Sequence, residues 1–364
     1  MIIKDIQTIE IRIPYTVLGT AKTDAWGGKH WSTADALLVR IETANGIIGW
    51  GEAFGYNSIA ATKTCIESLI KPLCIDQNIE NIQEFMTTLQ KKLHIFGRGG
   101  PVIFGLSGID IALWDIWAQE NQSSVAQLLG GSDFREVDAY ASLVRYEDPK
   151  TVSDNVKHCV DLGFEYVKLH EIDLRAITAA RRADPNVRLM LDVNCPWNTD
   201  EAIDMARKFQ ELDITWLEEP VWPPEDHLAL AKIRKEGGIP LAAGENAATL
   251  KQYETLMEAG SIDFIQPSPT KTGGISTTSE VFELAKKYNI RVVPHSFYEG
   301  PGLLAAIQTS AALSDKPLVE WRFFDCEDHL YGEEIVPKNG KMSVPNGIGL
   351  GLSPREEVIS KYKV

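Results

Sequence analysis

The sequence predicts an α/β protein made of a small N-terminal α+β unit and a parallel (β/α) barrel. The chain has 364 residues, of which 44% are hydrophobic and 24% charged, so it is long enough for two domains or one large barrel. From residue 131 onward, short β-branched or Leu-rich segments alternate with helical segments. Strands that alternate with helices form parallel βαβ units, and eight such strands favour a closed barrel over an open sheet.

The first third of the chain predicts a sheet followed by helices. Residues 2–13 and 36–42 alternate apolar and polar side chains as strands do, and Asn45-Gly46 joins the second strand to residues 47–52 in a hairpin. Apolar residues at helical spacing predict helices over residues 60–75, 79–93 and 105–119. Gly130-Gly131 then breaks the helical pattern, which places a domain boundary at residue 130.

The remaining two thirds of the chain supply the barrel. No GxGxxG motif follows any of its strands, so a dinucleotide-binding fold loses its main support. The predicted strands cover residues 140–144, 166–169, 189–193, 215–217, 241–243, 264–266, 291–294 and 318–321. The predicted helices between them include residues 152–162, 174–182, 199–212, 227–235, 249–259 and 277–288.

Charge and cysteine content exclude several classes of protein. With 36 basic and 51 acidic residues the net charge is −15, and no basic runs occur, which argues against nucleic-acid or anionic-membrane partners. No 18-residue apolar stretch or signal peptide is present, so neither a membrane span nor export is expected. The five cysteines show no CxxC pair and no zinc-site spacing, and they are expected to be buried thiols of a cytoplasmic protein.

Acidic residues end three consecutive barrel strands. Asp192, Glu218 and Glu245 are 26 and 27 residues apart, which is one βα unit per carboxylate. At the carboxyl end of a barrel these groups converge, and they repel one another unless a cation lies between them. Oxygen ligands with open coordination positions suit Mg²⁺. The spacing therefore predicts a magnesium site in a barrel enzyme.

Other ionisable residues end neighbouring strands. Lys168 and His170 lie two positions apart on the second strand, so both side chains point to the barrel interior. His295 ends the seventh strand and Glu320 the eighth. With a pKa near ~6.5, either histidine can act as an acid or a base, and the two approach a bound substrate from opposite sides.

This arrangement resembles the enolase superfamily and, within it, the mandelate racemase-like subgroup. The resemblance spans nearly the whole chain, and its short motifs occur in the expected order. The motifs are Ile48-Gly49-Trp50-Gly51-Glu52, Ala112-Leu113-Trp114-Asp115-Ile116 before Leu128-Leu129-Gly130-Gly131, Asp192-Val193-Asn194, Trp216-Leu217-Glu218-Glu219-Pro220, Gly244-Glu245-Asn246, Gly273-Gly274 and Pro294-His295.

The resemblance implies a modified TIM barrel, (β/α)7β, over residues 131–334. An α+β capping domain over residues 1–130 would be completed by the C-terminal segment 335–364. Asp192, Glu218 and Glu245 would hold one Mg²⁺ per subunit of a homo-oligomer. A Lys or His base beside the metal would remove the proton α to a substrate carboxylate, as is usual in this superfamily. A protonated Glu320 would hydrogen-bond the substrate carboxylate, and Lys168 would contact it.

Two positions depart from the subgroup pattern. Where many members carry Lys-x-Lys on the second strand with the second Lys as base, this chain has His170. Where the subgroup carries an Asp on the sixth strand that pairs with the strand-seven His, this chain has Ser268. Without that carboxylate His295 loses a partner that favours its charged form. The choice of base between His170 and His295 therefore stays open.

Two N-terminal loops are expected to cover the barrel mouth. Residues 20–31, rich in Gly, Trp and charge, resemble the specificity loop of the family, and residues 54–57 are the second lid. Trp197, Trp222 and Tyr298 could line the pocket or serve as packing residues. The candidate substrate contacts are Trp26, His30, Tyr56, Asn194, Ser268 and Lys271.

The leading hypothesis for function is a Mg²⁺-dependent lyase of carbohydrate catabolism that dehydrates a sugar acid. In this reaction His170 takes the α-proton, and His295 assists departure of the β-hydroxyl. The alternative is a racemase, epimerase or cycloisomerase that acts on a hydroxy acid or sugar lactone through the same first step. A third hypothesis, motivated by the missing strand-six Asp, is a catalytically silent barrel that binds a small carboxylate.

Overall fold

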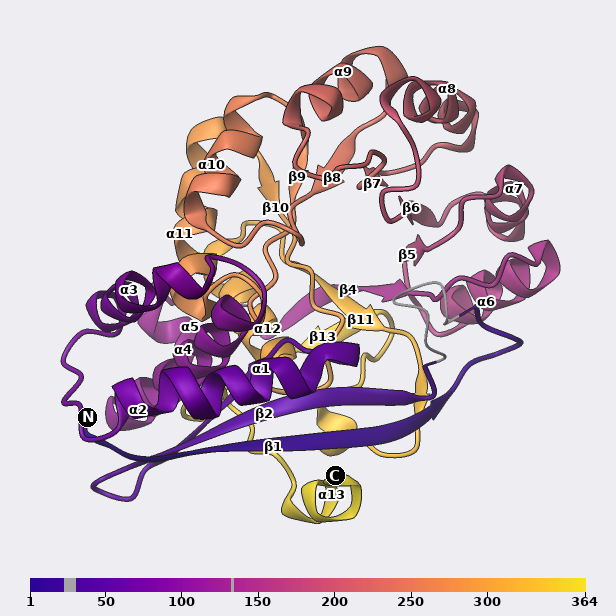
Figure 1. Ribbon diagram of the computed structural model, residues 1–364. Helices are drawn as coiled ribbons and strands as arrows, with labels where there is room; N and C mark the ends of the chain where they lie inside the picture. Colours follow the sequence, from indigo (N-terminus) through magenta and orange to yellow (C-terminus); the bar gives the residue numbers. More distant parts are fainter. Residues whose placement is uncertain (23–30, 132–133) are drawn as a thin grey trace.

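Two sheets organise the computed structural model, which describes residues 1–22, 31–131 and 134–364. One is a four-stranded antiparallel sheet, and the other is a curled parallel sheet of eight strands. Helices surround the outside of the parallel sheet, and further helices pack beside the antiparallel one (Figure 1). This is the α/β architecture with a barrel that the sequence predicts.

The antiparallel sheet has the strand order β12-β1-β2-β3. In the register of β1 (Ile3–Thr16), β2 (Thr33–Thr43) and β3 (Ile48–Ala53), Ile9 pairs with Leu38, which pairs with Glu52. The predicted hairpin joins β2 to β3, and Gly46 in its turn has a φ of +84°, a conformation that favours glycine.

Five helical segments lie beside this sheet, and α4 makes its main contact with β3. Residues 59–74 form α1 (Ile59–Cys65), a π-helical turn (Ile66–Ile70) and α2 (Lys71–Cys74), followed by α3 (Ile82–Leu93) and α4 (Pro101–Glu120). A Cβ at Gly51 of β3 would lie 1.9 Å from the carbonyl O of Gly108 in α4, so only glycine allows this approach. By length and composition α4 could cross a membrane, but 78% of its 18-residue apolar stretch is buried inside the protein.

The parallel sheet follows the chain order, with β10 and β11 at its two ends. Seven helices connect its eight strands among the described residues, which is the (β/α)7β pattern. Ser296, after β10, donates from Oγ to the carbonyl O of Glu320 on β11 at 3.0 Å, and this contact links the two ends. The strands are β4 (Glu136–Ser142), β5 (Tyr166–Leu169), β6 (Arg188–Asp192), β7 (Leu217–Glu218), β8 (Leu241–Ala243), β9 (Phe264–Ile265), β10 (Arg291–Val292) and β11 (Leu318–Arg322).

The connecting helices include one that the sequence did not predict. Eleven of the 13 residues of α12 (Pro301–Leu313) are buried, so the helix has no polar face and lacks the amphipathic pattern by which helices are recognised. The other helices are α6 (Pro149–Asp161), α7 (Leu174–Ala183), α8 (Thr199–Phe209), α9 (His227–Gly237), α10 (Leu250–Glu258) and α11 (Gly274–Tyr288), and α5 (Val125–Leu128) precedes β4.

A layer of buried side chains fills the barrel below the carboxyl ends of its strands. The layer consists of Tyr140, Met190, Trp216, Ala242, Val293 and Leu318, packed as one cluster. Side chains two positions apart on a strand point the same way. The next inward positions after Met190, Trp216, Val293 and Leu318 are Asp192, Glu218, His295 and Glu320. The apolar layer thus forms the floor beneath the ionisable residues.

The C-terminal segment contacts both sheets. The short strand β12 (Asp325–Cys326) pairs with β1, while β13 (Lys341–Ser343) pairs with β4 of the barrel. The last helix, α13 (Glu356–Tyr362), contacts β1, and the Val364 amide donates to the Glu10 carbonyl O at 3.0 Å. The division of the chain into domains at residues 130 and 334 stays a prediction.

The cysteines only partly match the expectation. All five are free, but Cys195 and Cys326 are partly exposed, whereas Cys65, Cys74 and Cys159 are buried. The expectation of five buried thiols was therefore wrong for two of them. Both of these lie on segments that follow barrel strands rather than on packed helices.

Candidate active site

Three carboxylates converge at the carboxyl ends of adjacent strands. Asp192 ends β6, Glu218 ends β7, and Glu245 follows β8. One ligand atom from each lies within 4.8 Å of the others, and the side chains of Asp192 and Glu218 are 2% and 0% exposed. Gly244, with a φ of +134°, brings the chain into the site, and a Cβ there would lie 2.9 Å from the Gln266 amide N. The structure thus brings together the predicted metal ligands.

The triad carries unfavourable charge of its own. Burial raises the pKa of Glu218 well above its usual range, and the neighbouring carboxylates Asp192, Glu320 and Glu245 raise it further, against the opposing effect of Lys168. A divalent cation bound to the three carboxylates would remove this repulsion. The donor set consists of oxygen atoms only, which suits Mg²⁺. The residues present therefore fit the ion that the sequence predicts.

Lys168 is the cationic centre of the site. Its Nζ lies 2.8 Å from Glu320 Oε1, 3.2 Å from Glu218 Oε1 and 3.6 Å from Asp192 Oδ2. The side chain is 1% exposed. Burial acts to lower its pKa, but Glu218 and Glu320 raise it well above the usual value, so Lys168 is an ammonium ion. The raised pKa favours the charged form of Lys168 over a role as base.

His170 is oriented by the backbone. Its Nδ1 contacts the carbonyl O of Leu143, which can only accept a hydrogen bond, so Nδ1 carries the proton. Its Nε2 then faces Asp192 Oδ2 at 3.2 Å. Arg145 donates from Nε to the His170 carbonyl O at 2.6 Å and fixes the backbone at this point. His170 thus presents Nε2 to the site.

His295 lies on the other side of the triad. Its Nε2 is 3.1 Å from Glu245 Oε2, and its Nδ1 is 3.2 Å from both Ser268 Oγ and Tyr298 OH. Ser268 Oγ and Tyr298 OH also contact each other. Burial lowers the pKa of His295, with Glu245 acting in the opposite direction. Two hydroxyls thus occupy the place of the carboxylate that the subgroup pattern expects, and the second of them, Tyr298, is supplied by the strand-seven loop.

Glu320 is ionised in the substrate-free protein. Burial alone would raise its pKa, but the Lys168 ammonium is the largest opposing effect, and the pKa falls from 4.5 to about 2. The Ser296 amide also donates to Glu320 Oε2 at 2.9 Å. The protonated Glu320 implied by the resemblance is therefore not the state of the substrate-free chain.

The other candidate substrate contacts fall into two groups. Asn194 donates from Nδ2 to Asp192 Oδ1 at 2.9 Å and lines the cavity above the triad. Lys271 lies deeper, 3.5 Å from Glu245 Oε1 and 5.0 Å from the centre of the Phe54 ring. The Lys271 ammonium therefore balances the charge of Glu245.

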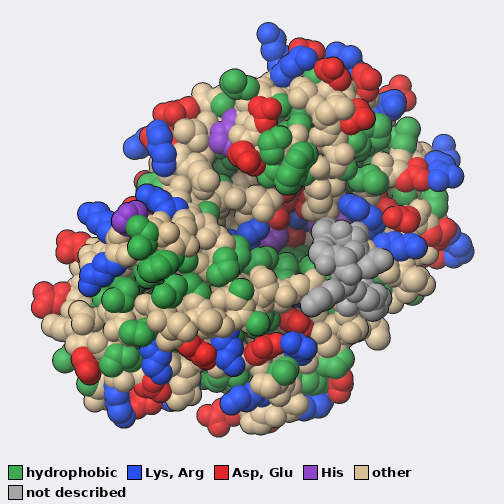
Figure 2. Space-filling model, in the orientation of Figure 1, with side chains coloured by type: hydrophobic (Ala, Val, Ile, Leu, Met, Phe, Trp, Pro, Cys, Tyr) green, Lys and Arg blue, Asp and Glu red, His purple; other side chains and the backbone are tan. Residues whose placement is uncertain are grey.

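A cavity opens directly above these groups. Acidic, basic and histidine side chains meet in the hollow between the barrel and the N-terminal elements (Figure 2). Tyr56 OH donates to the Phe297 carbonyl O at 2.8 Å, so this predicted lid residue is tied to the barrel. Trp26 and His30 lie outside the described residues. The lining residues are Trp31, Tyr56, His170, Asp192, Asn194, Glu245, His295 and Phe297.

Some site residues were not predicted from the sequence. Phe297 lines the cavity, and Arg145 fixes the His170 backbone. Phe297 is an aromatic residue in a loop, and no local pattern separates it from packing residues. Trp31, which also lines the cavity, ends the loop 20–31 that was predicted to cover the barrel mouth. Tyr298 was proposed as a possible pocket residue, whereas its hydroxyl contacts His295. Trp222 is 70% exposed and does not line the cavity.

Comparisons with known proteins agree with this geometry. Residues 27–130 match the family described as mandelate racemase / muconate lactonizing enzyme, N-terminal domain, and residues 151–358 match the enolase C-terminal domain-like family. The chain is 32% identical to arabinonate dehydratase of Saccharolobus solfataricus over 90% of this chain and 91% of that protein. It is 31% identical to D-galactarolactone cycloisomerase of Agrobacterium fabrum, with the same coverage of both chains.

Solved structures show the same fold. The 3,6-anhydro-D-galactonate cycloisomerase from Zobellia galactanivorans superposes with a TM-score of 0.86, 28% sequence identity and complete coverage of both chains. A racemase from Streptomyces coelicolor with bound magnesium superposes with a TM-score of 0.88 at 26% identity, again over both whole chains.

Proposed function

Because the chain belongs to the mandelate racemase / muconate lactonizing enzyme family of the enolase superfamily, we propose that it is a Mg²⁺-dependent dehydratase of a sugar acid. The substrate is a small polyhydroxy carboxylate with a hydroxyl on each of the carbons α and β to the carboxylate. Its α-proton and its β-hydroxyl leave as water, and the resulting enol tautomerises to a 2-keto-3-deoxy acid.

Asp192, Glu218 and Glu245 would hold the Mg²⁺ ion. When bound, the ion supplies positive charge that stabilises the negative charge developing on the substrate carboxylate as the α-proton leaves. Lys168 contributes a fixed ammonium ion on the same side of the site, 2.8 Å from Glu320. The carboxylate end of the substrate therefore belongs beside Lys168 and Glu320, against the barrel floor, and its binding there requires Glu320 to take up a proton.

His170 is the base in this proposal. Its Nδ1 proton is donated to the Leu143 carbonyl O, so the nitrogen that would take the α-proton is Nε2, which faces the site beside Asp192. Once His170 is protonated, the Asp192 carboxylate 3.2 Å away stabilises the imidazolium. Lys168 is already protonated and cannot take the proton.

His295 assists the leaving group from the opposite side. The imidazolium form of His295, which the Glu245 carboxylate 3.1 Å from Nε2 favours, passes its Nε2 proton to the β-hydroxyl as the carbon–oxygen bond breaks. The hydroxyl leaves as water and His295 is left as a neutral imidazole. The hydroxyls of Ser268 and Tyr298 orient the ring through Nδ1. After product release, the two histidines exchange protons with solvent and return to their starting states.

One observation carries the proposal: two histidines flank three convergent carboxylates. In the strand order of the sheet, His170 follows β5 and His295 follows β10, with the triad on β6, β7 and β8 between them. A proton can thus be removed on one side and delivered on the other. The 32% identity to a sugar acid dehydratase over nine tenths of the chain supports the choice of substrate class.

The test is turnover of a panel of aldonic and aldaric acids in D₂O with Mg²⁺. A dehydratase gives a 2-keto acid, detected as its semicarbazone. His170→Asn should abolish product, and the matched surface variant His94→Asn should not. If the protein binds an acid by calorimetry but turns over no member of the panel, the silent-barrel hypothesis replaces this one.

A cycloisomerase is the second candidate function, favoured by the similar identity to a cycloisomerase and to a dehydratase. The same histidines would then remove the α-proton and expel a ring oxygen, so no water is released. A ring-opened 2-keto acid isomeric with a cyclic substrate and carrying deuterium on the former β-carbon, with no 2-keto acid formed from any linear acid, would support this candidate and refute the dehydratase.

The homo-oligomer and the cytoplasmic location implied by the resemblance stay predictions. Light scattering of the purified chain checks the first, and fractionation of cells checks the second.

A further inference from the structure

A second group of metal-ligating side chains lies away from the acidic triad. It consists of Glu299, Cys326 and His329, each of which offers one ligand atom within 4.8 Å of the others. Glu299 follows β10, Cys326 belongs to β12, and His329 comes three residues later. The sequence spacing shows only a Cys-x-x-His pair, and the fold adds the carboxylate from a distant segment.

Two of the ligand distances are close to the edges of a tetrahedral site. Cys326 Sγ lies 3.8 Å from Glu299 Oε1, and His329 Nδ1 lies 3.4 Å from Glu299 Oε2. Bond lengths of about 2.3 Å to sulfur and about 2.0–2.1 Å to nitrogen or oxygen give tetrahedral edges of roughly 3.3–3.6 Å. The His329–Glu299 distance falls within this range, the Cys326–Glu299 distance is slightly longer, and the Cys326–His329 pair lies within 4.8 Å.

The chemistry of the donors selects the metal. One sulfur, one nitrogen and one oxygen form a borderline-soft set that suits Zn²⁺ and is a poor match for Mg²⁺. The acidic triad is the reverse case, because all of its donors are oxygen. The two sites of this chain therefore prefer different ions.

The surroundings hold the ligands in place. Glu299 is 2% exposed, and its Oε1 lies 3.3 Å from Arg322 Nη2. Burial raises the pKa of Glu299, but Arg322 is the largest opposing effect, and the pKa is lowered overall, so the carboxylate is ionised. Arg322 is held over the rings of Phe297 and Phe324, 5.4 and 5.1 Å from their centres. The positive charge of Arg322 weakens the binding of a cation, but it also keeps the Glu299 carboxylate ionised and therefore able to bind a metal.

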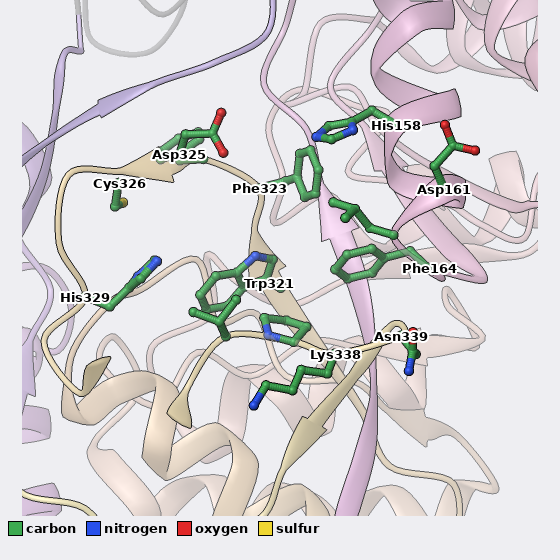
Figure 3. A pocket seen from close by; sticks show the side chains of 14 residues that line it. His158, Asp161, Phe164, Trp321, Phe323, Asp325, Cys326, His329, Lys338 and Asn339 are labelled. Atoms are coloured by element: carbon green, nitrogen blue, oxygen red, sulfur yellow. The ribbon is translucent and has the colours of Figure 1, made fainter. Parts of the chain in front are cut away.

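A groove gives access from solvent. Cys326 and His329 line one end of a cavity of about 500 Å³ between α6 and the segment after β11 (Figure 3). Both residues lie on the same side of it, toward β12. The groove supplies a path of entry for the ion and room for a water molecule as the fourth ligand.

We propose that Glu299, Cys326 and His329 form a Zn²⁺ site with three protein ligands and one water. Binding replaces the thiol proton of Cys326, which is released to solvent. Because β12 pairs with β1 and Glu299 follows a barrel strand, the ion connects the N-terminal sheet to the barrel. Zn²⁺ binding is therefore expected to stabilise the folded chain against unfolding.

Cobalt spectroscopy tests the proposal directly. Titrating the metal-free, full-length protein with Co²⁺ should give a thiolate-to-cobalt charge-transfer band in the near ultraviolet, which Zn²⁺ then displaces. The band should be lost in Cys326→Ser and weakened in His329→Gln. The control is Cys195→Ser, because Cys195 Sγ lies 3.6 Å from Glu219 Oε2, beside the acidic triad. A band that survives in C326S and disappears in C195S overturns the proposal.

Zn²⁺ affinity and thermal stability give a second readout. We expect Zn²⁺ to raise the melting temperature of the wild type and of Glu245→Gln, and to leave C326S unchanged. Affinity measured by competition with a chelating dye should fall about tenfold or more in H329Q, a size typical of lost metal contacts. Circular dichroism checks that each variant folds, and if C326S fails to fold, H329Q decides. Equal Zn²⁺ affinity of the wild type and H329Q overturns the site.

Discussion

Replacing Lys168 with Met tests the electrostatic design of the site. The substitution keeps most of the side-chain volume and removes one ammonium ion that contacts three carboxylates, at 2.8 Å from Glu320, 3.2 Å from Glu218 and 3.6 Å from Asp192. All of these groups are almost fully buried. The variant therefore leaves several buried negative charges without their cation.

The cost can be worked from the structure in two ways. The pKa of Glu320 falls from 4.5 to about 2, and at about 1.4 kcal/mol per pH unit this difference is worth roughly 3 kcal/mol. Removing one partner of a buried ion pair costs about 3–5 kcal/mol in other proteins. The two routes agree, so K168M should lower the free energy of unfolding by about 3 kcal/mol near pH 7.

The effect has a defined dependence on pH. The folded-state pKa of Glu320 is depressed, so its contribution is fully present above the unfolded value of 4.5 and is lost as the pH falls toward 2. The difference between wild type and K168M should therefore shrink with acid, to about 1.4 kcal/mol at pH 3. At high pH it is fully present up to the ordinary lysine pKa of 10.5 and is lost as the pH rises above that value toward the raised folded-state pKa of Lys168.

Urea unfolding followed by tryptophan fluorescence measures this difference. The experiment is done in EDTA, so that no divalent ion replaces the missing charge, and then repeated with Mg²⁺, which should recover part of the loss. Lys251→Met is the control, because its ion pair with Glu254 lies on the surface and its removal should change little. A K168M variant as stable as the wild type, or a difference that does not depend on pH, would refute the reasoning.

Three further predictions concern the bases and the packing. His170→Asn should lower the rate of α-proton exchange in D₂O by about 10²–10⁴-fold, which is the usual contribution of a general base, and should leave the Mg²⁺ affinity unchanged. NMR measures the exchange, and a rate that stays at the wild-type level would assign the base to His295. Ser268→Asp places a carboxylate beside His295 Nδ1 and should raise the pKa of this histidine by about 1 unit or more. The alkaline limb of the pH–rate profile should move up accordingly, and an unmoved limb would mean that His295 is not the acid. Gly51→Ala places a Cβ 1.9 Å from the Gly108 carbonyl O and should lower the free energy of unfolding by about 1–3 kcal/mol or more. The melting temperature should fall accordingly, and an unchanged melting temperature would show that β3 and α4 separate freely.

Much of the fold follows from local pattern. The alternation of strands and helices after residue 131 predicts the parallel sheet, and Asn45-Gly46 predicts the hairpin between β2 and β3. Helix α12 was missed because eleven of its 13 residues are buried, so it has no polar face to give a period. The strands β12 and β13 are two and three residues long, too short for a pattern.

The sequence also predicts which strand ends carry chemistry. Because consecutive parallel strands present their carboxyl ends at one edge, a carboxylate at each of three strand ends predicts the convergence of Asp192, Glu218 and Glu245. The pairing of His295 could not be predicted in this way. The Asp that pairs with this histidine in the subgroup is replaced by Ser268. The second hydroxyl comes from Tyr298, three residues after His295.

Local pattern was enough to predict most of the elements, their order and the ionisable groups at the strand ends, because these depend on residues near one another in the chain. The charge states and the contacts between distant segments arise only when the chain has its tertiary structure. Lys168 and Glu320 are 152 residues apart in the sequence, and their 2.8 Å contact sets the protonation of both. Glu299 follows β10 and meets Cys326 and His329 only in the folded chain. A pKa or a ligand set depends on what surrounds a group in space, and that surrounding exists only once the chain has folded.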